Sequence, residues 1–289
     1  MLAGLLRTMR PHQWVKNLFV VAPLVFAKEL FDLPTALRAL GAFVVFCLAS
    51  STVYYLNDLA DVEADRAHPV KRQRPIASGR VPVGVARNVA LGMALSAMAG
   101  GLALGLALLA TVVTYLVLNL AYSAHLKRVP YVDVLSIAAG FELRVLGGAF
   151  AALVPPSTYL LVVTFLLATF LGFGKRMHEL RQAEDRSMQR QVLRSYDPTT
   201  LNVLLYSTAT ATVLAYVLYT LDPTTHAFFG TRFLAATSPF TAFGVLRFLH
   251  LVRNRPEAES PTEEMLRDRP FLANLALWAV AVVLVIYLG

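Results

Sequence analysis

The sequence predicts an all-α, multi-pass membrane protein, a bundle of nine transmembrane helices joined by cytoplasmic loops. Of its 289 residues, 57% are hydrophobic and only 15% are charged, and the mean hydropathy is +0.59. Soluble domains carry about 25% charged residues, so this chain is not a single soluble domain. Intrinsic disorder needs low hydrophobicity and high charge, so the same composition excludes it. A transmembrane barrel would show short segments of alternating hydrophobicity, whereas the apolar runs here are long and continuous.

Nine apolar stretches could cross a bilayer, whose core of about 30 Å needs ~20 residues per helix. The first is short and contains Pro23, which a helix interior does not accommodate. Before it, Met1 to Lys16 lacks the features of a signal peptide, and we expect an interfacial segment with Trp14 at headgroup level. We expect one transmembrane domain over residues 1–289. Its nine spans cover residues 17–31, 37–58, 83–101, 104–124, 131–153, 157–177, 198–221, 231–252 and 270–288.

Basic residues gather in alternate connections, which sets the expected orientation. Most of the 26 Lys and Arg residues fall within residues 7–16, 66–87, 127–128, 175–194 and 247–269. The positive-inside rule then places the N-terminus and these loops in the cytoplasm, for a protein of the cell's inner membrane. The net charge of +8 follows from these loops and favours contact with anionic membrane lipids. Because the charge is divided among several loops, we do not expect nucleic-acid binding.

An acidic cluster follows the second span, where the chain reads Asn57-Asp58-Leu59-Ala60-Asp61-Val62-Glu63-Ala64-Asp65-Arg66. Asp58, Asp61 and Asp65 are spaced by three and four residues, so they share one face of a helix. Three like charges on one face repel, and a cation must offset them. Mg²⁺ commonly combines one or two carboxylates with substrate phosphates. The cluster therefore predicts a magnesium site with Asn57, Asp58, Asp61 and Asp65 as candidate ligands.

A basic stretch follows the acidic cluster and contains Arg66, Lys71, Arg72, Arg74 and Arg80. Lysine and arginine bind phosphate oxygens, arginine often through two hydrogen bonds. Acidic ligands followed by a basic loop therefore suit Mg²⁺ together with a polyanion. The alternative is a solvated, salt-bridged loop at the membrane surface, in which these basic side chains neutralise the acidic face.

The pattern Asn57-Asp58-x-x-Asp61-x-x-x-Asp65, at the cytoplasmic end of the second span, resembles the first aspartate-rich motif of the UbiA superfamily of intramembrane prenyltransferases. Five further segments resemble one branch of that superfamily, the decaprenyl-phosphate phosphoribosyltransferases. They are Arg10 to Asn17 (RPHQWVKN), Asp65 to Gly79, Tyr122 to Lys127, Gly140 to Val145 and Gly174 to Leu180. The resemblance extends over nearly the whole chain.

One departure separates this branch from prenyltransferases that act on aromatic acceptors. Those enzymes usually carry a second aspartate-rich motif after the sixth span, where this chain reads Lys175-Arg176-Met177-His178-Glu179. Two acidic motifs suit a site in which metals hold a prenyl diphosphate. One acidic and one basic motif suit two phosphorylated substrates.

The resemblance implies an Mg²⁺-dependent enzyme that transfers the phosphoribosyl group of 5-phosphoribosyl 1-diphosphate to polyprenyl (decaprenyl) phosphate and releases diphosphate. The product would supply a lipid-linked pentose donor for envelope polysaccharide. Asp58, Asp61 and Asp65 would hold the metal and the departing diphosphate, with Asn57 assisting. The other candidate substrate-binding residues are Lys16, Arg66, Lys71, Arg72, Arg74, Tyr122, Lys127, Arg144, Lys175, Arg176 and Glu179.

Several of these candidates have a structural alternative. Arg144 lies in the fifth span with Glu142, and charge inside a membrane indicates function unless it forms an interhelical pair. Glu179 follows Lys175 by four residues, a spacing that also suits a surface ion pair. Tyr122 could equally be an interfacial aromatic residue. The Gly147-Gly148 pair predicts close packing of helices rather than a phosphate-binding loop.

Two other functions compete with phosphoribosyl transfer. Prenyl transfer to an aromatic or other small acceptor is the commoner chemistry of the superfamily, and the Lys175-Arg176 sequence argues against it. A transporter or channel would be favoured by internal repeats, and the two halves show no convincing repeat. The sequence leaves open whether the chain forms homo-oligomers.

Overall fold

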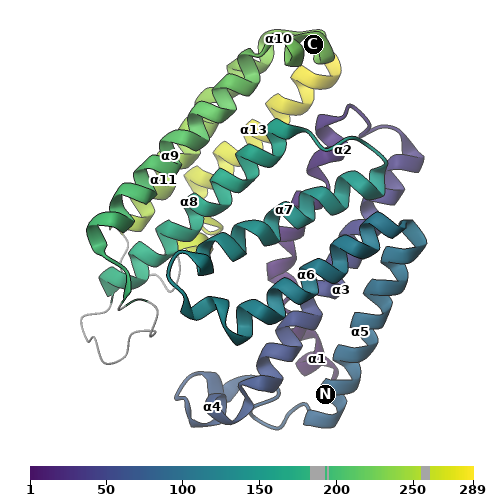
Figure 1. The fold of residues 1–289 in the computed structure, drawn as a ribbon, viewed down its shortest axis with the longest axis vertical. Helices are drawn as coiled ribbons and strands as arrows, with labels where there is room; N and C mark the ends of the chain where they lie inside the picture. The colour runs from purple at the N-terminus through teal and green to yellow at the C-terminus, as the bar shows by residue number, and fades with distance from the viewer. Residues whose placement is uncertain (183–192, 194, 255–260) are drawn as a thin grey trace. The chain divides into compact units, whose positions relative to one another are not determined.

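The structure, a computed structural model, describes residues 1–182, 193, 195–254 and 261–289, and nearly all regular structure in these ranges is helical (Figure 1). Parts of two basic loops, with Arg186, Arg190, Arg194 and Arg255, lie outside the described residues. The chain divides into two compact units. The first comprises Met1–Ala124 and Gly140–Pro156, and the second comprises His125–Ala139 and Ser157–Gly289. The single domain expected from the sequence stays a prediction.

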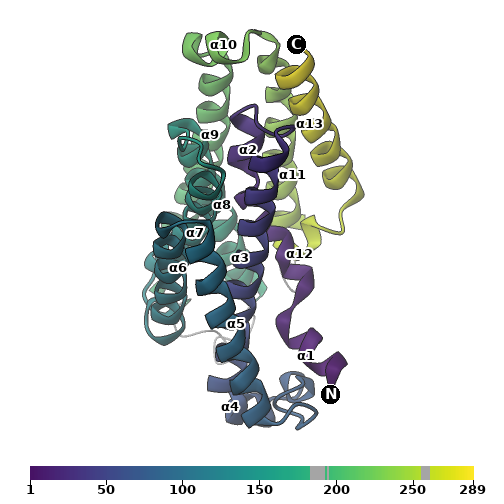
Figure 2. The same ribbon diagram turned by 90° about the vertical axis from the view of Figure 1, so that its right-hand side faces the viewer.

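The first unit is built around α3 (Leu33–Ala60), which packs against α1, η1, α5 and α6. The Asp32 side chain accepts a hydrogen bond from the Thr35 backbone N–H, and this cap starts the helix. Figures 1 and 2 both place α1 and α4 near the C-terminal end of α3. The other elements are α1 (Leu2–Met9), the 3₁₀ helix η1 (Pro11–Val20), α2 (Ala22–Phe26), α4 (Val62–Ala67), η2 (Lys71–Gln73), α5 (Val83–Leu104), α6 (Leu106–Ala124) and the second half of α7 (Val132–Ala152).

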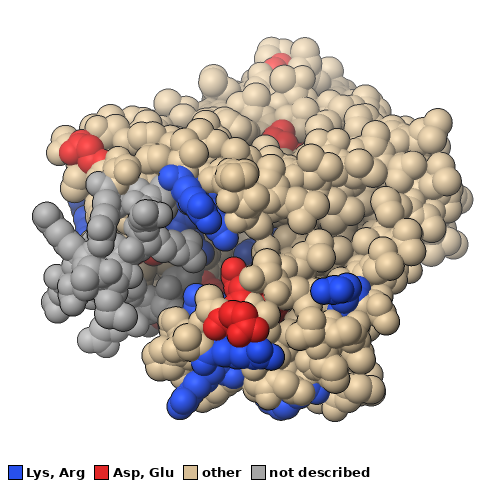
Figure 3. Space-filling view, turned by 60° about the horizontal axis from the view of Figure 1, so that its bottom comes forward, with Lys and Arg blue, Asp and Glu red and all other residues tan. Residues whose placement is uncertain are grey.

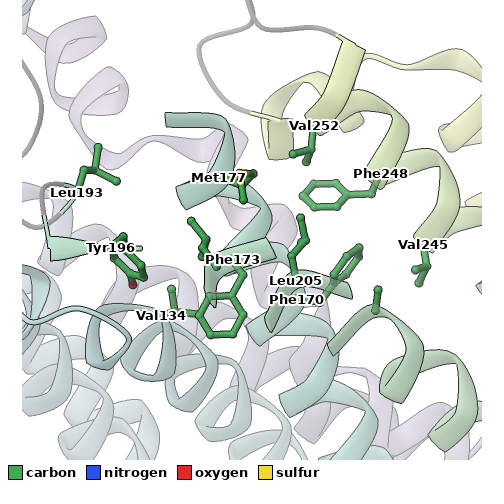
Figure 4. Packing of buried hydrophobic residues seen from close by; sticks show 12 residues of the cluster. Val134, Phe170, Phe173, Met177, Leu193, Tyr196, Leu205, Val245, Phe248 and Val252 are labelled. Atoms are coloured by element: carbon green, nitrogen blue, oxygen red, sulfur yellow. The ribbon is translucent and has the colours of Figure 1, made fainter. Parts of the chain in front are cut away.

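The second unit has α8 (Thr158–Gln182) and α9 (Pro198–Leu221) side by side, with α11 (Ser238–Asn254) packed against both (Figures 1 and 2). Its core gathers large apolar side chains between these helices (Figure 4). The rings of Phe170 and Phe248 meet edge to face, with centroids 5.1 Å apart. The remaining elements are η3 (Leu126–Arg128), the first half of α7, α10 (Pro223–Phe229), η5 (Phe233–Thr237), α12 (Pro261–Met265) and α13 (Arg269–Leu288).

Eight helices in the described residues are long and apolar enough to cross a bilayer, and they match eight of the nine predicted spans to within a few residues. Many of their apolar side chains face outward. On α13, Leu277, Val280 and Leu284 are 59%, 56% and 49% exposed. A surface of this kind suits contact with lipid tails, which are as apolar as leucine. The chain is a multi-pass membrane protein.

The structure does not confirm the first predicted span, residues 17–31. This stretch holds the end of η1, the short α2 and a turn at Lys28, whose φ is +62°. Pro23 lacks an N–H donor and favours a short, broken path over one long helix. Asn17 is buried, and its Nδ2 donates to Ser50 Oγ at 3.3 Å. The polar contacts of Asn17 therefore hold this part of the chain against α3.

Glycine allows the closest approach between elements of the first unit. A Cβ atom built on Gly148 of α7 would lie 1.8 Å from the carbonyl oxygen of Val20. A Cβ atom on Gly147 would lie 2.5 Å from the Phe46 ring. These distances confirm the packing role predicted for the glycine pair.

We expect Gly148→Ala to destabilise the protein by about 1–3 kcal/mol or more, because the neighbouring atom is backbone and cannot rotate away. Gly92→Ala is the matched control, since a Cβ atom there meets nothing within 4 Å. That substitution should be neutral or stabilising by about 0.5–1 kcal/mol, because alanine favours the helix. Thermal unfolding in detergent measures both changes. Equal melting temperatures for the two variants would contradict the packing seen at Gly148.

Candidate active site

A line of polar side chains runs along one side of α3. Its members are spaced three or four residues apart, so they point the same way from the helix. They are Cys47, Ser51, Tyr54 and Asp58. Trp14 Nε1 donates to Ser51 Oγ at 3.1 Å, and Ser51 Oγ donates to the Met9 carbonyl at 3.2 Å. These contacts fix the N-terminal segment beside α3 and bring Arg10 close to its C-terminal end.

An acid–arginine cluster, made of Arg10, Asp58, Asp65 and Arg74, lies at that end. Asp58 Oδ1 accepts hydrogen bonds from Arg10 Nη2 at 2.8 Å and from Arg74 Nη1 at 3.2 Å. Asp65 Oδ2 accepts from the same Arg74 Nη1 at 2.7 Å. Both carboxylate side chains are only 4% exposed, whereas the two arginine side chains are about one third exposed. The two negative and two positive charges balance.

Local structure sets the positions of both arginines. Arg10 joins α1 to η1 with φ +53°, a left-handed conformation that is uncommon for residues other than glycine. Its guanidinium carbon lies 4.9 Å from the centre of the Tyr54 ring, a cation–π contact. Arg74 ends η2, and the loop that follows is anchored by Ile76, which is buried in the core beside Tyr55.

The other residues of the predicted acidic face lie outside the acid–arginine cluster. Asp61 is exposed at the junction of α3 and α4. Asn57 Oδ1 accepts a hydrogen bond from Ser123 Oγ at 2.6 Å. Among the residues that the structure describes, no three His, Cys, Asp or Glu side chains lie close enough to hold a metal ion together. The structure thus brings together Asp58 and Asp65 but not Asp61. Arg74 neutralises this pair, as in the alternative hypothesis that basic side chains of the loop neutralise the acidic face.

The basic loop presents further cations next to the cluster. Arg66 donates to Glu63 at 2.8 Å and to the Ala77 carbonyl at 3.3 Å. Lys71 and Arg72 are exposed on η2. Seen from the end of the molecule at which α4 lies, acidic and basic side chains adjoin one another within a largely uncharged surface (Figure 3).

The carboxylates of the acid–arginine cluster are chemically suited to a divalent cation. Within the described part of the chain, Asp58 Oδ2 and Asp65 Oδ1 accept no hydrogen bond, although both side chains are nearly buried. Neither oxygen is among the fully buried side-chain atoms that lack a partner in the described residues, so both remain accessible to a ligand. Two carboxylate oxygens are also a sufficient protein contribution for Mg²⁺ when water and phosphate complete its shell.

Arg144 lies in a second polar network, inside the apolar part of the first unit. Its Nε donates to Asn17 Oδ1 at 2.8 Å, its Nη1 to the Gly140 carbonyl at 2.7 Å and its Nη2 to Tyr115 Oη at 2.9 Å. The residue is 7% exposed, and its guanidinium also stacks on the rings of Tyr115 and Phe141. Arg144 therefore ties α7 to η1 and α6.

Arg176 lies in a third network, within the second unit. Its Nε donates to Asp133 Oδ2 at 2.7 Å and its Nη1 donates to Glu179. Tyr196 donates its hydroxyl to Asp133 Oδ1, and it accepts the Tyr131 backbone N–H at 2.8 Å. Burial, together with the hydrogen bond to Asp133, raises the pKa of Tyr196. The hydroxyl therefore stays protonated and remains a donor to the carboxylate.

Four other predicted site residues, Lys16, Tyr122, Lys127 and Lys175, are half-buried.

Two charged residues of these networks were not among the site residues predicted from the sequence. Arg10 lies in the RPHQWVKN segment, but nothing in that segment indicates a partner 48 residues away. Asp133 did offer a signal, because a carboxylate at the start of an apolar span needs a partner.

These observations define a multi-pass, all-helical membrane protein with charged groups buried at a helix end and in two interior networks. The sequence places it more narrowly, because the model of the UbiA prenyltransferase family matches residues 18–275. The chain belongs to that family.

Curated relatives match over almost the full length. The decaprenyl-phosphate phosphoribosyltransferase of Corynebacterium glutamicum is 36% identical over 291 residues, covering 99% of this chain and 87% of the relative. The protein of the same name from Mycobacterium tuberculosis is 35% identical over 288 residues, covering 98% and 94%. Among solved structures, a UbiA homolog from Archaeoglobus fulgidus bound to GPP and Mg²⁺ has a TM-score of 0.71 at 18% identity, covering 98% and 99%. That likeness shows the fold.

We expect Asp133→Asn to destabilise the protein by about 3–5 kcal/mol, because the fully buried Arg176 would lose a charged partner. Glu179→Gln is the comparison variant and should cost less, since Glu179 is 17% exposed and Arg176 keeps Asp133. Thermal unfolding in detergent measures both. A larger loss of stability for Glu179→Gln than for Asp133→Asn would contradict the role of Asp133 as the main partner of Arg176.

Proposed function

We propose that this protein transfers the 5-phosphoribosyl group of 5-phosphoribosyl 1-diphosphate to polyprenyl phosphate, with Mg²⁺ as cofactor. The observation that carries the proposal is the 34–36% identity, over nearly the full chain, to proteins named decaprenyl-phosphate phosphoribosyltransferase. The acid–arginine cluster supports it, because two buried carboxylates beside exposed lysine and arginine suit a metal and a diphosphate.

The proposed metal ligands are Asp58 and Asp65, with Asp61 and Asn57 as further candidates. When bound, Mg²⁺ acts as a Lewis acid that stabilises negative charge on the departing diphosphate. For Asp61 to join the ligands, its exposed side chain would have to turn toward the other two carboxylates. Asn57 would have to exchange its contact with Ser123.

The remaining chemistry depends on orientation and charge. The bond between ribose C1 and the diphosphate oxygen breaks, and the diphosphate leaves with the electron pair. A phosphate oxygen of the lipid then forms a new bond to C1 from the opposite face. This phosphate is already anionic near pH 7, so no strong general base is required. Lys71, Arg72 and Arg74 hold phosphate oxygens in place, and such positioning can account for most of the rate.

The other candidate residues divide by their surroundings. Lys16, Arg66, Tyr122, Lys127 and Lys175 are proposed contacts for the lipid phosphate or the ribose 5-phosphate. Arg144, Arg176 and Glu179 are already engaged in buried networks, so we propose that they support substrate binding by fixing the helices. The polyprenyl tail would lie against apolar helix surface.

The distribution of basic residues supports an inner-membrane protein with its N-terminus and active site in the cytoplasm. This orientation would give the enzyme access to a water-soluble sugar phosphate and a lipid at the same time.

A single assay tests the reaction. Membranes containing the protein are incubated with Mg²⁺, polyprenyl phosphate and 5-phosphoribosyl 1-diphosphate labelled in the ribose. Label should enter the organic phase only when all three are present. A parallel incubation contains prenyl diphosphate. If it gave prenylated aromatic products, and the first incubation gave no lipid-linked label, the alternative of prenyl transfer would be supported instead.

We expect Asp58→Asn and Asp65→Asn to lower kcat/KM by about 100-fold or more, as loss of charge stabilisation at a developing anion does. Glu63→Gln is the matched control, an exposed acid on the same short helix as Asp65 that pairs with Arg66 instead. It should retain near-normal turnover. Wild-type turnover in both aspartate variants, with the control unchanged, would remove the cluster from the active site.

A further inference from the structure

The two oxygens of the Asp58 carboxylate differ in the hydrogen bonds that they accept. Oδ1 accepts hydrogen bonds from Arg10 and Arg74, while Oδ2 accepts none from the described residues. Asp65 shows the same division, with Oδ2 bound to Arg74 and Oδ1 left over. Each carboxylate therefore binds arginine through one oxygen, and the other oxygen accepts no hydrogen bond from the described residues.

The two arginines are also only partly used. Arg10 donates to Asp58 through Nη2, and Arg74 donates through Nη1. A guanidinium has five N–H donors in a rigid fork, so each retains donors for a further acceptor. Both side chains are about 30% exposed, in contrast to the 4% exposure of the carboxylates. The arginine side chains are therefore more accessible than the carboxylates.

We propose that Arg10 is a further diphosphate-binding residue, held in place by Asp58 and the Tyr54 ring. This inference rests on the proposed function and adds to it a residue from the N-terminal segment. The unused N–H groups of Arg10 and Arg74 bind oxygens of the diphosphate, while the unused oxygens of Asp58 and Asp65 face the cation bound to it. Because Asp58 fixes Arg10 beforehand, little side-chain entropy is lost when the phosphate binds.

The charges are consistent with this arrangement. The cluster by itself is neutral, so it attracts neither a free cation nor a free anion strongly. A metal–diphosphate complex presents both signs, and each meets its counterpart. Arg10 consequently has opposite effects on the two ligands, since it repels the cation and attracts the diphosphate. A residue that served only to hold Asp58 in place would help both.

The experiment measures binding to the full-length protein in detergent. Mn²⁺ replaces Mg²⁺ because its EPR signal reports the free ion directly. Mn²⁺ is titrated alone, and radiolabelled inorganic diphosphate is then titrated at excess Mn²⁺ by equilibrium dialysis. The test variant is Arg10→Asn, because asparagine tolerates the left-handed backbone found at this position. Arg7→Ala is the control, since it removes a cation from an exposed position on the same segment.

For Arg10→Asn we expect diphosphate binding to weaken about tenfold, as loss of a charge-assisted hydrogen-bonding group does. Binding of Mn²⁺ alone should become equal or tighter. Arg10→Lys should weaken diphosphate binding less, because it keeps the charge but not the fork. Arg7→Ala should match the wild type in both titrations.

Unchanged diphosphate binding in Arg10→Asn, or equal weakening of both ligands, would overturn the role of Arg10. Either result would leave the proposed function standing if Asp58→Asn still abolished Mn²⁺ binding. If the wild type bound neither Mn²⁺ nor diphosphate, both this inference and the proposed function would fail. The melting temperature of each variant shows whether that variant is folded. If Arg10→Asn is not folded, the diphosphate binding of Arg10→Lys tests the role of Arg10.

Discussion

Burial of the Asp58 carboxylate at the end of an apolar helix is the constraint on which the first unit depends. A carboxylate that is 3% exposed is costly unless cations and hydrogen bonds compensate it. Compensation comes from Arg10 and Arg74, which lie 48 and 16 residues away in the chain. The N-terminal segment must therefore stay beside α3, and the loop after α4 must fold back toward it.

The positive charges of the two other buried arginines are compensated in different ways. Arg144 is surrounded by neutral oxygens and aromatic faces, which spread its charge without cancelling it. Arg176 has two carboxylates, and one of them, Asp133, is itself oriented by Tyr196. Each network joins separate elements: Arg144 ties α7 to η1 and α6, and Arg176 ties α8 to α7. Charged side chains in apolar surroundings thus specify which helices meet, a task that the uniformly apolar surfaces between them cannot perform.

The sequence predicted the long helices well and the broken segment poorly. Span prediction depends on the length and hydropathy of a continuous run, and eight helices satisfy both. Residues 17–31 have a suitable hydropathy, but Pro23 and the buried contacts of Asn17 turn them into short pieces. Helical spacing likewise predicted one acidic face over residues 58–65. The helix instead ends at Ala60, and α4 begins at Val62. Asp61, at the junction, is exposed, whereas Asp65 is buried.

By itself, the sequence determined the all-helical membrane class, the positions of eight spans and the acidic and basic segments of the candidate site. These are properties of neighbouring residues, because hydropathy, charge and helical spacing act over a few turns. Only the tertiary structure decided that Arg10 reaches Asp58, that Arg74 bridges two carboxylates and that Asp133 holds Arg176. Such pairs depend on how separate helices pack, and packing brings together residues whose separation along the chain carries no signal of their contact.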